Sequence, residues 1–138
     1  MPNDEHPNVS LIRSMFDAYH GPDGFGRAEL ENGFAEDAVF YVIGEHPRGG
    51  RYEGIDGAAQ IVGNLVGDSS GTWRPLAMDL RAIGDEIVVL HVREGAEVAG
   101  VHHEGDVVVV VRFVDGKIVE GARFTDSELA EHWAKALA

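Results

Sequence analysis

The sequence predicts an α+β domain, in which a mostly antiparallel sheet curves into a cone and helices cover its concave face. Three observations predict it. Four strand-like segments follow one another in the second half of the chain, and Asp115-Gly116 marks a hairpin turn between two of them. Segments with helical periodicity stand before and after this series. Helices segregated from a run of strands are typical of α+β domains, and a curved sheet of this kind encloses a pocket.

The first half of the chain is expected to supply three helices and one strand. Apolar residues recur at helical spacing over Val9–His20, and Gly21-Pro22-Asp23-Gly24 ends that segment. A short helix over Arg27–Phe34 follows. The other expected elements are a strand at Ala38–Ile43, an extended piece at Arg51–Glu53 within the loop Gly44–Gly54, and a helix at Ile55–Val66.

The second half is expected to form four strands and a helix. Six of the eight residues from Val107 to Val114 are valine, a β-branched residue that favours strands. Because this run is apolar on both faces, we expect one face to cover the core and the other to be covered by a second subunit of a homodimer. The other expected elements are strands at Thr72–Ile83, Glu86–Glu94 and Lys117–Asp126, and a helix at Asp126–Leu137.

Length and composition limit the kind of protein. The chain has 138 residues, enough for one domain, which we place at residues 8–138 after a disordered leader of residues 1–7. A formal charge of −13 argues against nucleic acid and anionic membranes as partners. The sequence has no cysteine, and its N-terminus lacks the basic and apolar regions of a signal peptide. We therefore expect a cytoplasmic protein.

Three segments together resemble a known family. They are FAEDAVFYVIG at residues 34–44, RYEGIDGAAQIV at 51–62, and VVVVVRFVDGKIVEGARFTDSELAEHWA at 107–134. Their order and spacing resemble the SnoaL-like branch of the nuclear transport factor two-like superfamily, over residues 9–135. The resemblance implies the cone-shaped fold. That fold serves polyketide cyclases, ketosteroid isomerases, limonene-epoxide hydrolases and binding domains without catalysis, so it does not select one activity.

The catalytic residues of these relatives are replaced here. Ketosteroid isomerases, which are similar, carry a carboxylate base on the first strand and a tyrosine on the first helix, where this chain has Val42 and Met15. The cyclases and epoxide hydrolases carry an acid on the last strand, where this chain has Arg123. An Arg and Asp pair of the epoxide hydrolases corresponds to His91 and Arg93. Enolisation by the isomerase route is therefore not expected.

The alternation of side chains along a strand groups the remaining candidates. His91 and Arg93 share a face of one strand, and Arg123 lies on a face of another. Two interpretations stay open: these side chains meet inside the cone as catalytic residues, or the arginines pair with neighbouring carboxylates or lie on the outer face. A shift of one residue in the pairing of either strand would move these side chains from one face of the sheet to the other, and so decides between the two interpretations. The expected ligand-binding residues are Met15, Phe40, Val42, His46, Tyr52 and Trp73.

No metal or cofactor site is expected. His102, His103 and Glu104 are adjacent, so along a strand they point alternately to opposite faces and cannot converge on one ion. The glycines from Gly49 to Gly57 are not followed by the Gly-Lys-Ser/Thr element of a phosphate loop.

Two functions remain open from the sequence. In the first, the cavity binds a small, partly apolar molecule that is acidic or bears a carbonyl, without catalysis. In the second, His91 acts as general acid and base while Arg93 and Arg123 stabilise an oxyanion in a cyclase, isomerase, dehydratase or epoxide hydrolase. Since the sequence offers few carboxylates to neutralise buried arginines, we expect an acidic ligand to do so.

Overall fold

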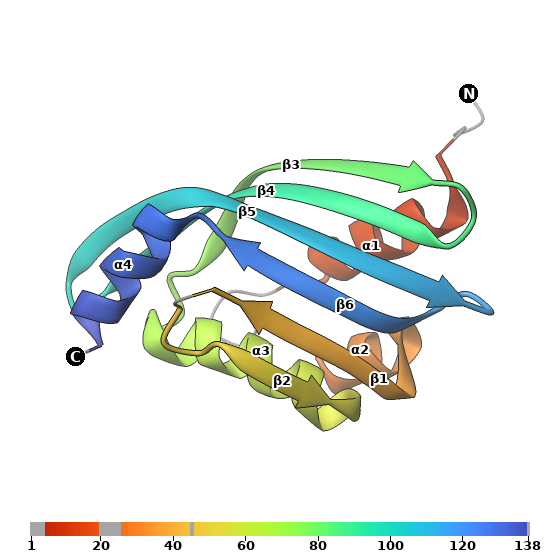
Figure 1. Ribbon diagram of the computed structural model, residues 1–138, viewed down its shortest axis with the longest axis horizontal. Helices are drawn as coiled ribbons and strands as arrows, with labels where there is room; N and C mark the ends of the chain where they lie inside the picture. Colours follow the sequence, from red (N-terminus) through yellow and green to blue (C-terminus); the bar gives the residue numbers. More distant parts are fainter. Residues whose placement is uncertain (1–4, 20–25, 45, 138) are drawn as a thin grey trace.

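The computed structural model describes residues 5–19, 26–44 and 46–137, which fold into one curved sheet with helices packed on it (Figure 1). The strands are β1 (Phe34–Ile43), β2 (Gly50–Glu53), β3 (Arg74–Ile83), β4 (Ile87–Val98), β5 (Val101–Val114) and β6 (Lys117–Thr125). The helices are α1 (Pro7–Asp17), α2 (Arg27–Gly33), α3 (Gly54–Asp68) and α4 (Ser127–Ala136). The predicted α+β class and its mostly antiparallel sheet are confirmed.

The first helix begins earlier than expected. The His6 side chain caps α1 by accepting a hydrogen bond from the Asn8 backbone N–H at 3.1 Å. Glu5 accepts hydrogen bonds from Ser10 and Arg13 at 3.0 and 2.9 Å. Residues 5–7 therefore take part in the fold, although the sequence placed them in a disordered leader. Residues 1–4, and the predicted end of this helix at His20, lie outside the described residues.

The six strands run in the order β2-β1-β6-β5-β4-β3. Only the β1–β6 pair is parallel; the other four pairs are antiparallel. This pairing sets Phe40 beside Gly121 and Val42 beside Arg123. The first and the last strand in the sequence thus lie side by side, and Phe40, Val42, Gly121 and Arg123 share the inner face of the sheet.

The β4–β5 hairpin is longer than the sequence predicted. Its strands pair from Ile87 with Arg112 to Val98 with Val101, around a turn at Ala99-Gly100. Both turn residues have positive φ, 51° and 79°, which is the backbone of a two-residue hairpin turn. Because alanine rarely adopts positive φ, Ala-Gly is a weak turn signal, and the sequence therefore did not predict a turn here.

The inner face of the sheet forms the core with the helices. On β4 the even-numbered residues from Val88 to Val98 point inward, and on β5 the odd-numbered residues from His103 to Phe113 do. Helix α4 lies close to β5, and a Cβ added at Gly105 would stand 2.8 Å from Leu129. Trp133 of α4 is 1% exposed and packs in one cluster with Trp73.

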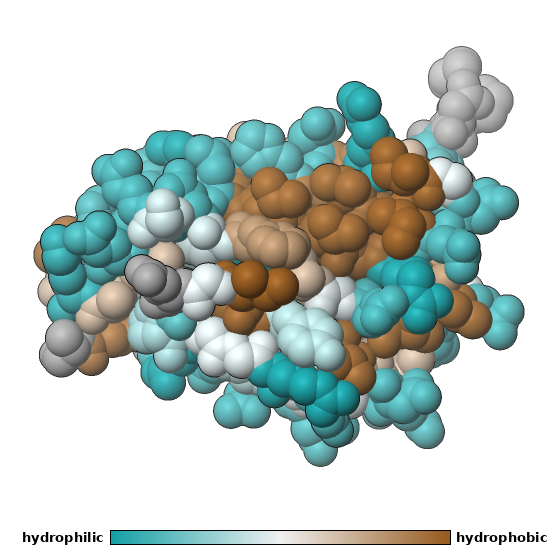
Figure 2. Space-filling view, in the orientation of Figure 1, coloured by the Kyte–Doolittle hydropathy of each residue, from teal (hydrophilic) through white to brown (hydrophobic). Residues whose placement is uncertain are grey.

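The outer face of the sheet carries an apolar patch that faces the viewer in Figure 2. Tyr41, Val108 and Phe124 are 39%, 37% and 45% exposed on it. Ile87, Val110 and Ala122 border the same shallow depression, together with the paired side chains of Arg112 and Glu120. No helix among the described residues has the length and apolarity needed to span a membrane.

Candidate functional site

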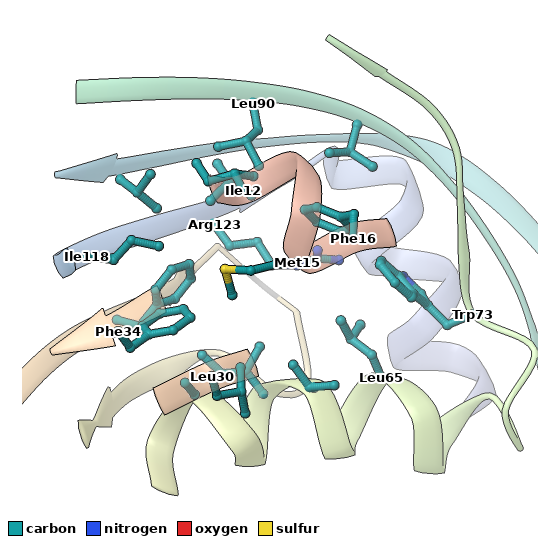
Figure 3. Close-up of a pocket in the computed structure, with 17 residues that line it drawn as sticks. Ile12, Met15, Phe16, Leu30, Phe34, Leu65, Trp73, Leu90, Ile118 and Arg123 are labelled. Atoms are coloured by element: carbon teal, nitrogen blue, oxygen red, sulfur yellow. The ribbon is translucent and has the colours of Figure 1, made fainter. Parts of the chain in front are cut away.

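The main cavity lies between the inner face of the sheet and helices α1, α2 and α3 (Figure 3). Its volume is about 130 Å³. An apolar protein cavity of about 150 Å³ holds a benzene molecule, so this space suits one small ring. Among the described residues that line it, Arg123 is the only charged one. The apolar lining comes from Ile12, Met15, Phe16, Leu30, Phe34, Phe40, Ala58, Ile61, Val62, Leu65, Trp73, Leu90, Val92, Val109, Val111 and Ile118.

Arg123 is held by a buried carboxylate. Its Nη2 donates to Glu94 Oε1 at 2.6 Å, and the two side chains are only 8% and 2% exposed. The indole N–H of Trp73 donates to the other oxygen, Glu94 Oε2. The Trp73 backbone is fixed in turn, because its carbonyl accepts from the Tyr19 hydroxyl at 2.6 Å. The Arg123–Glu94 pair therefore presents a polar but nearly neutral group at the end of an apolar cavity.

His91 and Arg93 do not enter the cavity. Both lie on the outer face of β4, where His91 Nε2 and Arg93 Nη1 are each 3.0 Å from an Asp106 carboxylate oxygen. Their side chains are 57% and 45% exposed. Of the two interpretations left open by the sequence, the second therefore holds for these residues: they pair with a carboxylate on the outer face, and their grouping with Arg123 as catalytic residues inside the cone is wrong. Since alternate side chains face opposite sides of a strand, their neighbours Val92 and Glu94 face inward instead.

Glu94 is the buried residue that the sequence analysis missed. It follows Val88, Leu90 and Val92 on the inward side of β4, and it sits across the sheet from Arg123. The expectation that an acidic ligand neutralises the buried arginine is therefore wrong, because Glu94 already supplies the counter-charge. The alternation on β4 was the available signal, but from Ile87 to Leu90 the strand is apolar on both faces, and the polar residues His91, Arg93 and Glu94 that follow are divided between the two faces.

A second chamber adjoins the main cavity. It is bordered by His46, Arg48, Tyr52, Asp68, Arg123 and Trp133, with Val42, Ile61, Asn64 and Leu65, and its volume is about 10 Å³. Arg123, Ile61 and Leu65 border both spaces. Arg48 is bound to Asp68 through two hydrogen bonds of 2.6 and 2.8 Å. One oxygen-sized group fits a space of this volume.

His46 is buried in this chamber at 6% exposure. Its Nδ1 accepts a hydrogen bond from the Arg48 backbone N–H at 3.1 Å, and its ring packs against the Trp133 ring, with 5.2 Å between centroids and 41° between the ring planes. Burial, with the nearby Arg123 guanidinium, lowers the pKa of His46 to about 4. The imidazole is therefore neutral near pH 7. With Nδ1 as acceptor, the proton resides on Nε2, which has no hydrogen-bond partner among the described residues.

The expected ligand-binding residues divide between the two spaces. Met15, Phe40 and Trp73 line the main cavity, whereas Val42, His46 and Tyr52 line the second chamber. Arg123 lies at their junction. The sequence did not identify the wall supplied by α3, because a helix with an apolar stripe gives no sign of whether that stripe meets other side chains or an open space.

The His102-His103-Glu104 segment lies within β5. His102 Nε2 is 2.7 Å from Glu104 on the outer face, while His103 points inward to His132 of α4, 5.1 Å away between ring centroids. In the part of the chain that the structure describes, no three histidine, aspartate or glutamate side chains are grouped as they would be around a metal ion.

The sequence has a relative in Mycobacterium tuberculosis. That uncharacterised protein is 26% identical over 117 residues, which cover 85% of this chain and 87% of the relative. No family model matches the sequence.

Solved structures establish the fold. Bal32a, from a soil-derived mobile gene cassette, superposes with a TM-score of 0.81 at 20% identity, over 92% of this chain and 95% of that one. A nuclear transport factor two-like protein of unknown function from Burkholderia pseudomallei gives 0.79 at 20% identity, over 97% and 100%. A protein assigned as a SnoaL-like polyketide cyclase from Jannaschia gives 0.77 at 20% identity, over 99% of both chains. The chain therefore has the nuclear transport factor two-like fold.

Proposed function

We propose that the protein binds a small, partly apolar molecule that carries a carbonyl group, with its ring in the main cavity and its oxygen toward Arg123. The observation that carries this proposal is an apolar cavity of about 130 Å³ with a single charged lining residue. Apolar walls supply affinity, and one placed polar group fixes orientation.

The pairing of Arg123 favours a neutral ligand over an acid. Glu94 already compensates the guanidinium charge at 2.6 Å. A bound carboxylate would therefore add a third, uncompensated charge to a buried site, and losing its hydration would cost several kcal/mol, on the order of the penalty known for buried ions. A carbonyl oxygen can accept from a guanidinium N–H without that cost. A ligand ammonium group would meet the positive charge of Arg123, and both Glu94 oxygens already accept a hydrogen bond, from Arg123 and from Trp73.

Calorimetry with benzamide, benzoate and benzylamine tests the proposal, because the three share one ring and differ in the polar group. We expect benzamide to bind best, benzoate more weakly and benzylamine not at all. Val109→Phe, which grows into the cavity from β5, should abolish binding, and Arg93→Met on the outer face should preserve it. Equal affinity for all three compounds, or binding unaffected by Val109→Phe, would refute the proposed site.

A further inference from the structure

His46 carries a buried hydrogen-bond donor that has no partner among the residues that the structure describes. The ring is fixed on one edge by the Arg48 N–H and on one face by Trp133. Its free edge, Nε2, is buried and makes no hydrogen bond to any described residue. A buried donor without an acceptor destabilises a fold, so such groups are normally satisfied by water or a ligand. The second chamber, which His46 borders, is the space in which that acceptor would lie.

We propose that the second chamber receives the carbonyl oxygen of the ligand, and that His46 Nε2–H donates a hydrogen bond to it. The proposal rests on the proposed function and deepens it, since it names a second residue that recognises the oxygen. The chamber volume of about 10 Å³ accommodates one oxygen atom and excludes a ring. The ring would remain in the main cavity, which meets the chamber at Ile61, Leu65 and Arg123.

The charges around His46 make it a donor and not a base. Arg123 and Arg48 face it with positive charge, and Asp68 opposes them. Burial and Arg123 together keep its pKa at about 4, so the ring carries one proton, on Nε2, near neutral pH. Arg123 is also a donor only. His46 and Arg123 thus both offer hydrogen-bond donors at the polar end of the site, which suits the carbonyl oxygen of a ketone, amide or lactone as acceptor.

Two probes of similar shape can test whether His46 donates a hydrogen bond to the ligand or only supports the wall of the cavity. Ethylbenzene and acetophenone share a ring and a two-carbon substituent, but only acetophenone carries an oxygen acceptor. The variants are His46→Asn, whose shorter side chain keeps an acceptor near the position of Nδ1 but loses the donor at Nε2, and His46→Gln, whose amide reaches the Nε2 position. Titration calorimetry of both probes against the wild type and the two variants gives six affinities to compare.

We expect His46→Asn to weaken acetophenone about three- to tenfold, the range for loss of one neutral hydrogen bond, and to leave ethylbenzene unchanged. His46→Gln should recover part of the loss.

An equal loss for both probes would mean that His46 only supports the cavity, and no loss for either would mean that water occupies the chamber; both outcomes overturn the proposal. If the wild type binds ethylbenzene but not acetophenone, the main cavity is a binding site but the second chamber does not accept the oxygen, and the proposal is wrong. If it binds neither, the proposed function itself fails.

Discussion

Two arginines of this protein pair with carboxylates in opposite environments. Arg123 and Glu94 are buried side by side on the inner face of the sheet, whereas Arg93 and Asp106 are about half exposed on the outer face. The two pairs have similar N–O distances, 2.6 and 3.0 Å. Burial is therefore the main difference between them, and it decides how much each arginine matters to the fold.

Arg123→Met should destabilise the protein by about 3–5 kcal/mol, because it leaves Glu94 buried without a counter-charge. Arg93→Met should change the stability by about 1 kcal/mol or less, as expected for an exposed pair. Urea denaturation followed by circular dichroism measures both. The double variant Arg123→Met with Glu94→Gln should recover part of the loss; similar costs for the two single variants would show that Glu94 is solvated.

The pH dependence of stability should report on His46. Its folded pKa of about 4 lies below its ordinary value of 6.5, so the unfolded chain binds a proton in this interval and the folded chain does not. Stability must therefore fall as the pH falls from about 6.5 to about 4, with a contribution from His46 on the order of 1–3 kcal/mol. Urea titrations of the wild type and His46→Asn across this range should give a shallower decline for the variant. Parallel curves would indicate that His46 is protonated normally in the fold.

At the scale of single residues, the sequence identified Arg123 as a candidate site residue but did not identify Glu94, the carboxylate that pairs with it. The alternation along β6 placed Gly121 and Arg123 on one face of the strand but did not say which face points inward; that depends on the pairing of β6 with β1, which sets Arg123 beside Val42. On β4 the same reasoning failed, since Ile87–Leu90 is apolar on both faces, and only the elements that cover each face decide which one is the core. His46 follows no periodic rule, because its burial depends on Trp133 in a distant helix.

The elements of the fold show how closely α4 approaches the sheet. Gly105 of β5 faces Leu129 of α4, where an added Cβ would lie 2.8 Å from two carbon atoms of that side chain. Gly63 of α3 is the opposite case: it is exposed and nothing lies within 4 Å of an added Cβ. One glycine permits a helix to pack, while the other only lowers the helix propensity of its segment.

Gly105→Ala should therefore cost about 1–3 kcal/mol through overpacking against α4. Gly63→Ala should stabilise the protein by about 0.5–1 kcal/mol, because alanine is the better helix former. Thermal unfolding of both variants, followed by circular dichroism, tests the two predictions. A neutral Gly105→Ala would mean that the helix can move away from the strand without loss.

The elements were the most predictable part of this chain. Every predicted helix and strand exists, with ends shifted by a few residues, because periodicity and Gly-rich turns are local properties. The exception is the extension of β4 and β5 around Ala99-Gly100. There the strands are rich in charged and small residues, and their pairing depends on the hairpin as a whole.

At the scale of the whole molecule, the outer face of the sheet exposes an apolar patch that no helix of the same chain covers among the described residues. Tyr41, Val108 and Phe124 lie on the outer face of β1, β5 and β6, and the opposite charges of Arg112 and Glu120 border them. In a two-fold dimer each patch meets its own copy, so Arg112 of one protomer can face Glu120 of the other. We propose that the protein forms such a homodimer.

Sedimentation velocity at micromolar concentration should then show a dimer for the wild type and a monomer for Phe124→Lys, which places a charge in the patch without entering the core. Val101→Lys is the matched control, since Val101 is 55% exposed at the tip of the β4–β5 hairpin, outside the patch. A monomeric wild type, or a dimer that persists in Phe124→Lys, would contradict this arrangement.

The position of β6 has a consequence for how the chain folds. It is the last of the six strands in the sequence, yet it lies between β1 and β5 and joins two otherwise separate sheets, β2-β1 and β5-β4-β3. The sheets β2-β1 and β5-β4-β3 can form from local contacts. They are joined into one sheet only when β6, Lys117–Thr125, pairs with both β1 and β5. Contacts between such distant segments slow folding. A nascent chain that lacks β6 would hold two unpaired strand edges, on β1 and β5, and would be most prone to aggregate at that stage.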